Sequence, residues 1–254
     1  MLKKFFFLFF AFFYGYLFAI VNVTVMDTEA KSNGIYEDLE FSIESEKGNS
    51  DTLEYDFSSY TTYFLEKEYW LLDLSYNLEK ANSINTKNKA YLHLRNVINF
   101  YEKKSDSALN KIDFEYFGQI ENNEFQLLKI RALAGVGLRF KPIKNYEFFL
   151  GIGSMLMRET YLNDEKNKIF GRINTYLAIE NSLTEKIAIG YIGYYQPKIN
   201  EFSDYESKHT FTLNVDISKN LKLQNKIIYI YDSNPVGHVR IYDLEQKTSL
   251  IFSF

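Results

Sequence analysis

Residues 70–79 read WLLDLSYNLE, and the alternation in this stretch decides the fold of the chain. Trp70 and every second residue as far as Leu78 are apolar or aromatic, whereas the alternate positions from Asp73 to Glu79 are polar. A helix would scatter those polar groups around its axis, but a β-strand places alternate residues on opposite faces. The stretch therefore predicts a β-strand with one apolar and one polar face.

The same period of two recurs along the chain. It is clearest in the segments 39–44, 53–58, 129–139, 210–217 and 243–254. With the intervening clusters of Asn, Asp, Gly and Ser it predicts twelve strands, at 35–47, 51–65, 69–80, 88–102, 109–119, 124–140, 146–159, 168–181, 186–197, 205–218, 221–232 and 241–254. Most exceed the usual strand of about 5–6 residues. A tilted strand that crosses a bilayer needs about 9–11 residues, so the lengths favour strands that span a membrane.

The predicted turns alternate in length. Tight turns at 181–185 and 218–221 alternate with longer connections at 198–207 and 232–240. Short periplasmic turns opposite longer outer loops are typical of bacterial outer-membrane barrels. An even number of strands places both ends of the chain in the periplasm.

Residues 1–19 are predicted to direct export. A short cationic start with Lys3 and Lys4 precedes an almost wholly apolar run at 5–21, and Ala19 suits a cleavage site. The run is slightly shorter than the roughly 20 residues of a spanning helix, which leaves an uncleaved anchor helix as the alternative. We expect a cleaved, helical signal peptide at 1–19, a short periplasmic leader at 20–34 and one β-domain at 35–254.

The last strand keeps its apolar face to the final residue. Leu250, Phe252 and Phe254 share that face, and a terminal aromatic of this kind resembles the signal by which outer-membrane barrels are recognised for assembly. A soluble β-sandwich also alternates, but in lipid every backbone donor must be paired, so a sheet must close on itself. We therefore expect an all-β, closed antiparallel transmembrane barrel of about twelve strands in the bacterial outer membrane. Its partners would be outer-membrane lipid and the barrel-assembly machinery.

Composition limits the chemistry. Phe, Tyr and Trp make up 18% of the residues, which suits strands and membrane interfaces. The net charge of −4 and the lack of a dense basic stripe argue against a nucleic-acid partner. With no cysteine there is no thiolate metal site or disulfide framework, and we predict no cofactor.

The three histidines are the residues to test for a metal site or for catalysis. His93, His209 and His238 lie in different segments with no carboxylate at ligand spacing. A lipid hydrolase would need a Ser–His pair on the lipid side, but alternation turns His93 inward with Tyr91 and Arg95. We read the other two histidines as rim or loop residues and predict a protein that is not an enzyme.

Several short motifs follow one another along almost the whole predicted β-domain. They are Gly48-Asn49, Arg131-x-x-x-Gly135-x-Gly137, Tyr195-x-Pro197, Asp216-Ile217-Ser218 before Asn220-Leu221-x-Leu223, and Pro235-x-Gly237 with Asp243 and Phe254. In this order they resemble the family of salt-induced outer-membrane proteins, a domain of unknown function. The resemblance implies an outer-membrane barrel and brings no assigned activity.

The inward positions carry most of the charge. Those on the first three strands are acidic: Glu40, Glu44, Glu54, Asp56, Asp73 and Glu79. Those on strands four to eight lean basic: His93, Arg95, Lys129, Arg131, Arg139 and Arg172. The closing strands mix both signs, with Asp216, Lys222, Lys226, Asp243, Glu245 and Lys247. These charges either pair across a filled interior or line a water-filled pore with a transverse field.

From this pattern we predict a narrow channel for small hydrophilic solutes or ions, with the charged lumen as its filter. The one-sided clustering of inward charge is the observation behind it. A non-conducting structural barrel with a filled interior is the second reading. A surface receptor or adhesin is the third, although the loops lack the large aromatic anchors of binding hot spots.

Overall fold

The computed structural model describes residues 32–46, 52–81, 84–102, 111–124, 127–143, 146–162, 164–237 and 239–254. The expected signal peptide, nearly all of the leader, and His238 lie outside the described residues.

The described residues form twelve β-strands, as the alternation predicts. They are β1 (Gly34–Glu46), β2 (Thr52–Phe64), β3 (Glu68–Ala81), β4 (Ile84–Glu102), β5 (Lys111–Asn123), β6 (Leu128–Lys141), β7 (Glu147–Tyr161), β8 (Asp164–Thr184), β9 (Ile187–Lys198), β10 (Glu201–Ser218), β11 (Leu221–Asp232) and β12 (Tyr242–Ser253). Within the described residues, no helix combines the length and apolar character needed to cross a membrane.

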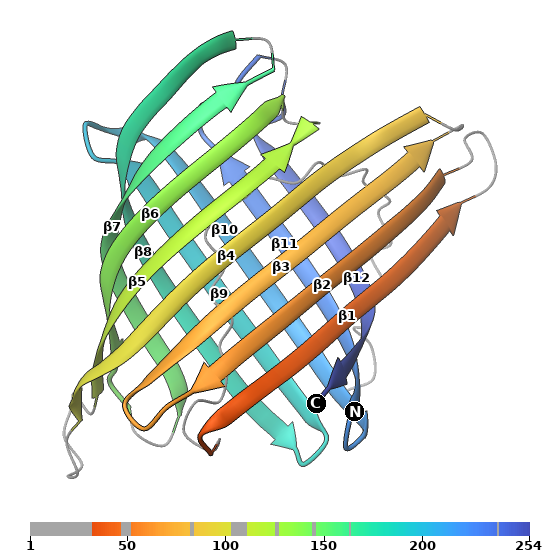
Figure 1. Ribbon diagram of the computed structural model, residues 1–254, viewed down its shortest axis with the longest axis vertical. Helices are drawn as coiled ribbons and strands as arrows, with labels where there is room; N and C mark the ends of the chain where they lie inside the picture. The colour runs from red at the N-terminus through yellow and green to blue at the C-terminus, as the bar shows by residue number, and fades with distance from the viewer. Residues whose placement is uncertain are drawn as a thin grey trace, which may run out of the picture.

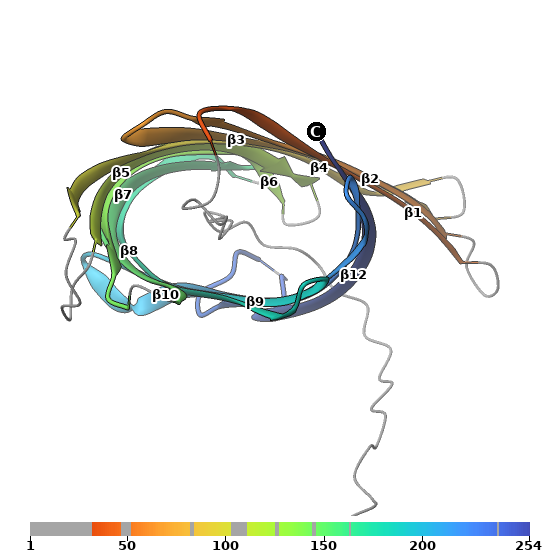
Figure 2. The same cartoon turned by 90° about the horizontal axis from the view of Figure 1, so that it is seen from below.

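The strands form one closed antiparallel barrel in which each strand pairs with its neighbours in the chain, and β1 closes the ring against β12 (Figures 1 and 2). The beginning of β1 and the end of β12 meet at the same end of the barrel, where Glu37 and Phe254 exchange backbone hydrogen bonds. We call this the terminal end and the opposite one the far end. The predicted all-β barrel fold is confirmed.

Two predicted boundaries on the later strands are wrong. The long connection expected at 198–207 is a turn of two residues, and β10 begins at Glu201. A register shift between Glu201 and Tyr205 interrupts the alternation there, which made this part of the strand look like a loop. β8 is also longer than predicted and runs from Asp164 to Thr184.

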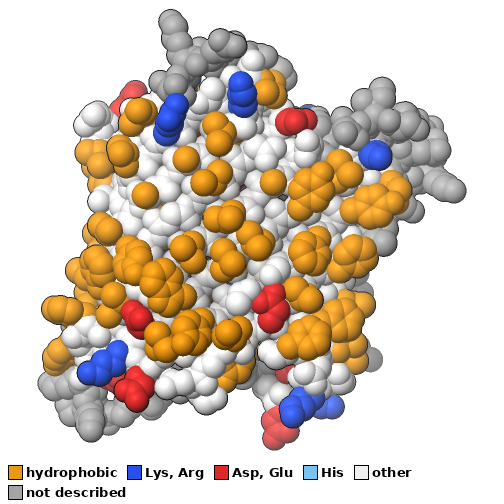
Figure 3. All heavy atoms as spheres, viewed as in Figure 1, with side chains coloured by type: hydrophobic (Ala, Val, Ile, Leu, Met, Phe, Trp, Pro, Cys, Tyr) orange, Lys and Arg blue, Asp and Glu red, His pale blue; other side chains and the backbone are white. Residues whose placement is uncertain are grey.

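The two faces of the wall differ as the alternation requires. Outward residues such as Phe41, Leu94, Val136 and Leu213 are exposed. On the face drawn in Figure 3, hydrophobic side chains are spread over much of the wall. The inner face carries nearly all of the buried charged groups. Polar side chains therefore gather inside the barrel, and the interior is the candidate site.

Candidate functional site: the charged interior of the barrel

A network of ion pairs around Arg131 occupies the far half of the interior. The Arg131 guanidinium lies 3.0 Å from Oε1 of Glu121 on β5 and 2.5 Å from Oε1 of Glu159 on β7. Arg172 on β8 lies 3.0 Å from Asp204 and 3.1 Å from Glu206 on β10. Glu206 also lies 3.6 Å from Arg131, so it joins the two arginines. We call this the Arg131 network.

A second cluster surrounds Arg139 toward the terminal end. Arg139 donates to Oδ2 of Asp113 through Nε at 3.0 Å and Nη2 at 2.7 Å, and to the Tyr69 hydroxyl at 2.7 Å. Its guanidinium lies 4.5 Å from the centre of the Phe149 ring. The Tyr176 hydroxyl donates to Glu115 at 2.6 Å. Every charge in this Arg139 cluster therefore has both a polar partner and an aromatic neighbour.

The third cluster lies on the strands that close the barrel. The Glu40 carboxylate of β1 accepts hydrogen bonds from Lys226 of β11 at 3.0 Å and from Ser249 of β12 at 2.6 Å. Lys247 of β12 lies 3.0 Å from Glu40 and 3.8 Å from Asp56 of β2. This Glu40 cluster links β11 and β12 to β1 and β2.

Exposure to solvent differs between charged groups in the middle of the closing strands and the arginines of β6 and β8, whereas Lys111, Glu147 and Lys198 at the ends of β5, β7 and β9 remain 17–25% exposed. The side chains of Lys226, Lys247 and Asp56 remain 17%, 16% and 15% exposed. Those of Arg131, Arg139 and Arg172 are only 4–6% exposed. We call the inner face of β4–β9 the packed side and that of β11, β12, β1 and β2 the hydrated side, because water reaches charged groups on the second.

Most residues predicted to line the lumen lie inside. Eight are buried: Glu40, Asp73, His93, Arg95, Arg131, Arg139, Arg172 and Asp243. Five more are partly buried: Glu54, Asp56, Glu79, Glu245 and Lys247. The side chain of Glu44 lies outside the described residues.

Two predicted lumen residues are exposed. A register shift between Leu128 and Ile130 changes the alternation, so Lys129 borders a depression of the outer wall together with Ile130. Asp216 is exposed at the end of β10, where the register also shifts. Irregularities of pairing at strand ends explain both corrections.

The prediction that the inward positions of strands four to eight lean basic is also corrected. Six buried carboxylates that the sequence reading missed lie beside its arginines: Asp113, Glu115, Glu121, Glu159, Asp204 and Glu206. Three of them, Asp113, Glu115 and Glu121, are on β5, where they alternate with Ile112, Phe114 and Ile120, a signal that the sequence contains. Asp204 and Glu206 lie in the stretch 198–207, where the sequence predicts a long connection.

The histidines occupy different environments. His93 is fully buried between the rings of Tyr91 and Phe117, as predicted for an inward residue. His209 is not at a rim: it lies within β10, and its Nδ1 is 2.8 Å from the Tyr191 hydroxyl.

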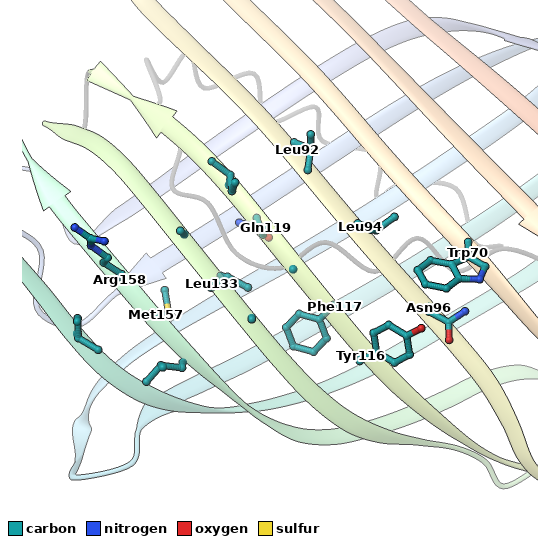
Figure 4. A pocket seen from close by; sticks show the side chains of 16 residues that line it. Trp70, Leu92, Leu94, Asn96, Tyr116, Phe117, Gln119, Leu133, Met157 and Arg158 are labelled. Carbon is teal, nitrogen blue, oxygen red and sulfur yellow. The ribbon is translucent and has the colours of Figure 1, made fainter.

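The outer wall has a depression of about 600 Å³ over β3–β8 (Figure 4). Small residues create it, since Gly118 pairs with Ala134 and Ala132 lies near them. Trp70 and Arg158 line its borders, and its lining is almost entirely apolar. Leu250, Phe252 and Phe254 are likewise exposed on the outside of β12. Their role as an assembly signal stays a prediction.

A family model described as "Protein of unknown function, DUF481" matches residues 39–254. The chain belongs to the DUF481 family. The match runs from β1 to the last residue and therefore covers nearly the whole barrel of this DUF481 protein. The name that refers to salt, suggested by the short motifs, stays a prediction. No curated protein matches the chain.

Solved barrels resemble this DUF481 protein at low identity. The NanC porin is 10% identical, with 86% of this chain and 97% of that chain covered and a TM-score of 0.47. The KdgM porin is 10% identical, with 87% and 99% covered and a TM-score of 0.41. The translocator domain of autotransporter NalP from Neisseria meningitidis is 9% identical, with 89% and 90% covered and a TM-score of 0.43. We therefore base the function on the residues of this chain.

Proposed function

We propose that this DUF481 protein is an outer-membrane barrel that conducts ions or small hydrophilic solutes along its hydrated side. The apolar outer wall and the polar interior support the membrane location, because a spanning barrel alternates between lipid-facing and lumen-facing residues. Closure of the sheet supports it too, since lipid offers no partners for an open edge.

The exposure of Lys226, Lys247 and Asp56 is the observation that carries the conducting role. Charges that water reaches can exchange with ions, whereas desolvated and fully paired charges hold a structure together. The passage would then be narrow and off-centre, because Arg131, Arg139 and Arg172 on the packed side are almost inaccessible.

The test is conductance of the refolded protein in a planar bilayer at two salt concentrations, followed by the reversal potential in a salt gradient. We expect discrete openings that grow with salt. The double variant Lys226→Gln/Lys247→Gln should shift selectivity toward cations, because two positive charges leave the passage. Lys129→Gln is the control for position: it removes one positive charge from the exposed surface of the wall and should leave selectivity unchanged. Equal selectivity in all three proteins would contradict the proposal.

The packed side favours one other candidate, a barrel with a structural role in the envelope. Its arginines are paired with carboxylates and stacked on aromatic rings, as in a filled core. An inserted, heat-modifiable barrel that stays silent in the bilayer would favour this role over conduction.

A further inference from the structure

The outer wall has a second depression beside the one over β3–β8. It has a volume of about 500 Å³, lies over β2–β6 and is lined by residues that include Phe57, Ala90 and Lys129. The two depressions share Leu92 and Ile120, which pair with each other on β4 and β5 and have exposed side chains. These two side chains therefore form a ridge between the depressions. We call the depression over β3–β8 the first depression and its neighbour the second depression.

Small residues leave room for a ligand on this part of the wall. In the first depression, a Cβ added to Gly118 would meet no atom nearer than the Leu133 carbonyl oxygen, at 3.7 Å. Ala134 pairs with Gly118, and Ala90 lines the second depression, so short side chains lower the wall in both. The volumes of about 600 and 500 Å³ fall in the range of about 300–1,000 Å³ that is typical of small-molecule sites. Each depression is therefore large enough to hold an apolar chain.

A cation borders each depression on the side of the far end. Arg158 lines the first depression and Lys129 the second, and both side chains are exposed. Arg158 lies three residues before the end of β7, and Lys129 is the second residue of β6. Figure 4 shows Arg158 and Trp70 at opposite borders of the first depression. Among the described lining residues only Glu121 is acidic, and its carboxylate bonds to Arg131 on the inner face. The border toward the far end is therefore positively charged.

The ridge and the two cations lie in a fixed order. Successive partners across β4–β7 are Leu92, Ile120, Ala132 and Arg158. Lys129 lies three residues from Ala132 toward the far end, about 10 Å along β6 at about 3.3 Å per residue. A head group held by both cations would have one depression next to each contact, with the ridge between them.

Lysine and arginine on a lipid-facing wall cost least near the membrane interface, and a phosphate there adds charge-assisted hydrogen bonds. We infer that this part of the outer wall binds one lipid with an anionic phosphate head and two acyl chains. The head lies at Arg158 and Lys129, and one chain lies in each depression. The inference rests on the proposed membrane location and adds a site that conduction through the interior does not use.

The test uses Trp70, the only tryptophan of the chain, which lines the first depression at the border opposite Arg158. The protein is refolded into mixed vesicles of phosphatidylglycerol and phosphatidylcholine, in which one lipid or the other carries brominated acyl chains. Bromine quenches the indole on contact. The ratio of the two quenching efficiencies, at equal mole fractions of brominated lipid, therefore measures the preference for the anionic head.

The double variant Arg158→Gln/Lys129→Gln removes both cations of the site. Lys80→Gln/Arg240→Gln is the matched control, because it removes two positive charges from exposed side chains near the far end that line neither depression. We expect phosphatidylglycerol to quench Trp70 several-fold more efficiently than phosphatidylcholine in the native protein and in the control. Without the two cations of the site, both lipids should quench equally.

A further variant tests the place of the chain. Gly118→Leu keeps both cations and fills the first depression, so the preference for phosphatidylglycerol should fall several-fold. Ala134→Leu fills the same space from the neighbouring strand if Gly118→Leu does not fold. An undiminished preference in a folded, filled variant would contradict a chain in this depression.

Equal quenching by both lipids in the native protein, or a preference that survives the loss of both cations, would overturn the lipid site. So would an inserted barrel whose Trp70 neither lipid quenches, because a second copy of the chain would then cover the depression. These outcomes leave conduction, measured on the same preparations, untouched. A protein that does not insert at all rejects the membrane location, and the site with it.

Discussion

Asp113 on the packed side and Asp56 on the hydrated side have the same side chain on the same face of the barrel wall. Asp113 is 2% exposed and accepts two hydrogen bonds from Arg139. Asp56 is 15% exposed, accepts hydrogen bonds from Ser42 and Asn77, and lies 3.8 Å from Lys247. Pointing inward is therefore not enough to make a charge part of a passage.

Aromatic volume accounts for the difference. On the packed side, Phe117, Phe149 and Tyr176 fill the space between the charged groups and stack on Arg95 and Arg139. Such rings exclude water, and each buried charge there depends on its partner. On the hydrated side Tyr60 lies 5.6 Å from the Lys226 ammonium, but Lys226, Lys247 and Asp56 keep 15–17% of their side-chain surface exposed, so water shares in their solvation.

The largest expected effect comes from Asp113→Asn. It removes the carboxylate that accepts two hydrogen bonds from the buried guanidinium of Arg139 and leaves only Glu115, at 3.8 Å, so it should lower the free energy of unfolding by about 3–5 kcal/mol, as for a broken buried ion pair. Urea unfolding of the protein in lipid vesicles measures it. A loss below about 1 kcal/mol would mean that Asp113 is solvated like an exposed partner and that the packed side is not dry.

An intermediate effect is expected from Gly153→Ala. A Cβ at this position would lie 2.2 Å from the Val136 carbonyl oxygen and 2.8 Å from Cα of Gly137, and this backbone cannot move away easily. We expect a loss of about 1–3 kcal/mol, typical of overpacking. Gly118→Ala is the control, since its Cβ would meet nothing nearer than 3.7 Å and should change stability by less than about 0.5 kcal/mol. Similar losses in both variants would point to strand propensity instead of crowding.

The smallest effect on stability is expected from Asp56→Asn, the same chemical change as Asp113→Asn. Water screens Asp56 from Lys247, so the cost should stay within about 1 kcal/mol. Its effect on conduction should be the larger one, because a negative charge leaves the proposed passage and selectivity should shift toward anions. A stability loss as large as that of Asp113→Asn would remove the distinction between the two sides.

Alternation predicted the wall of the barrel well. Strand β11 was predicted at 221–232 and lies at Leu221–Asp232, and Arg131, Arg139 and Asp243, which alternation places inward, are buried. These features are local, because the side-chain period of a strand is set within a few residues. Alternation gave the wrong face for Lys129, because a register shift between Leu128 and Ile130 interrupts the period of two and no turn residue in the sequence indicates it.

The pairing of charges could not be predicted in the same way. Glu206 and Arg131 belong to β10 and β6, and only the curvature of the closed wall brings them to 3.6 Å. Alternation identifies Arg131 as an inward residue but does not say which strands face each other across the interior. The expected separation of acidic and basic walls was wrong for this reason. Arg131, Arg139 and Arg172 have carboxylate partners that come from neighbouring strands and from across the barrel.

The pairing that closes the barrel, between β1 and β12, covers only Asp38–Phe41 of β1. This short seam has a consequence for the order of folding. Every other pairing joins consecutive strands, so it can form as a hairpin soon after its two strands are available. The seam joins Asp38 to Ser253, at opposite ends of the described chain, and closing so long a loop carries the largest entropic cost and the slowest rate. The barrel therefore closes last at the place where it has the fewest hydrogen bonds to gain. A chain that stopped before Leu250 would lose the residues of β12 that pair with β1. Its hairpins could form, but the sheet would stay open.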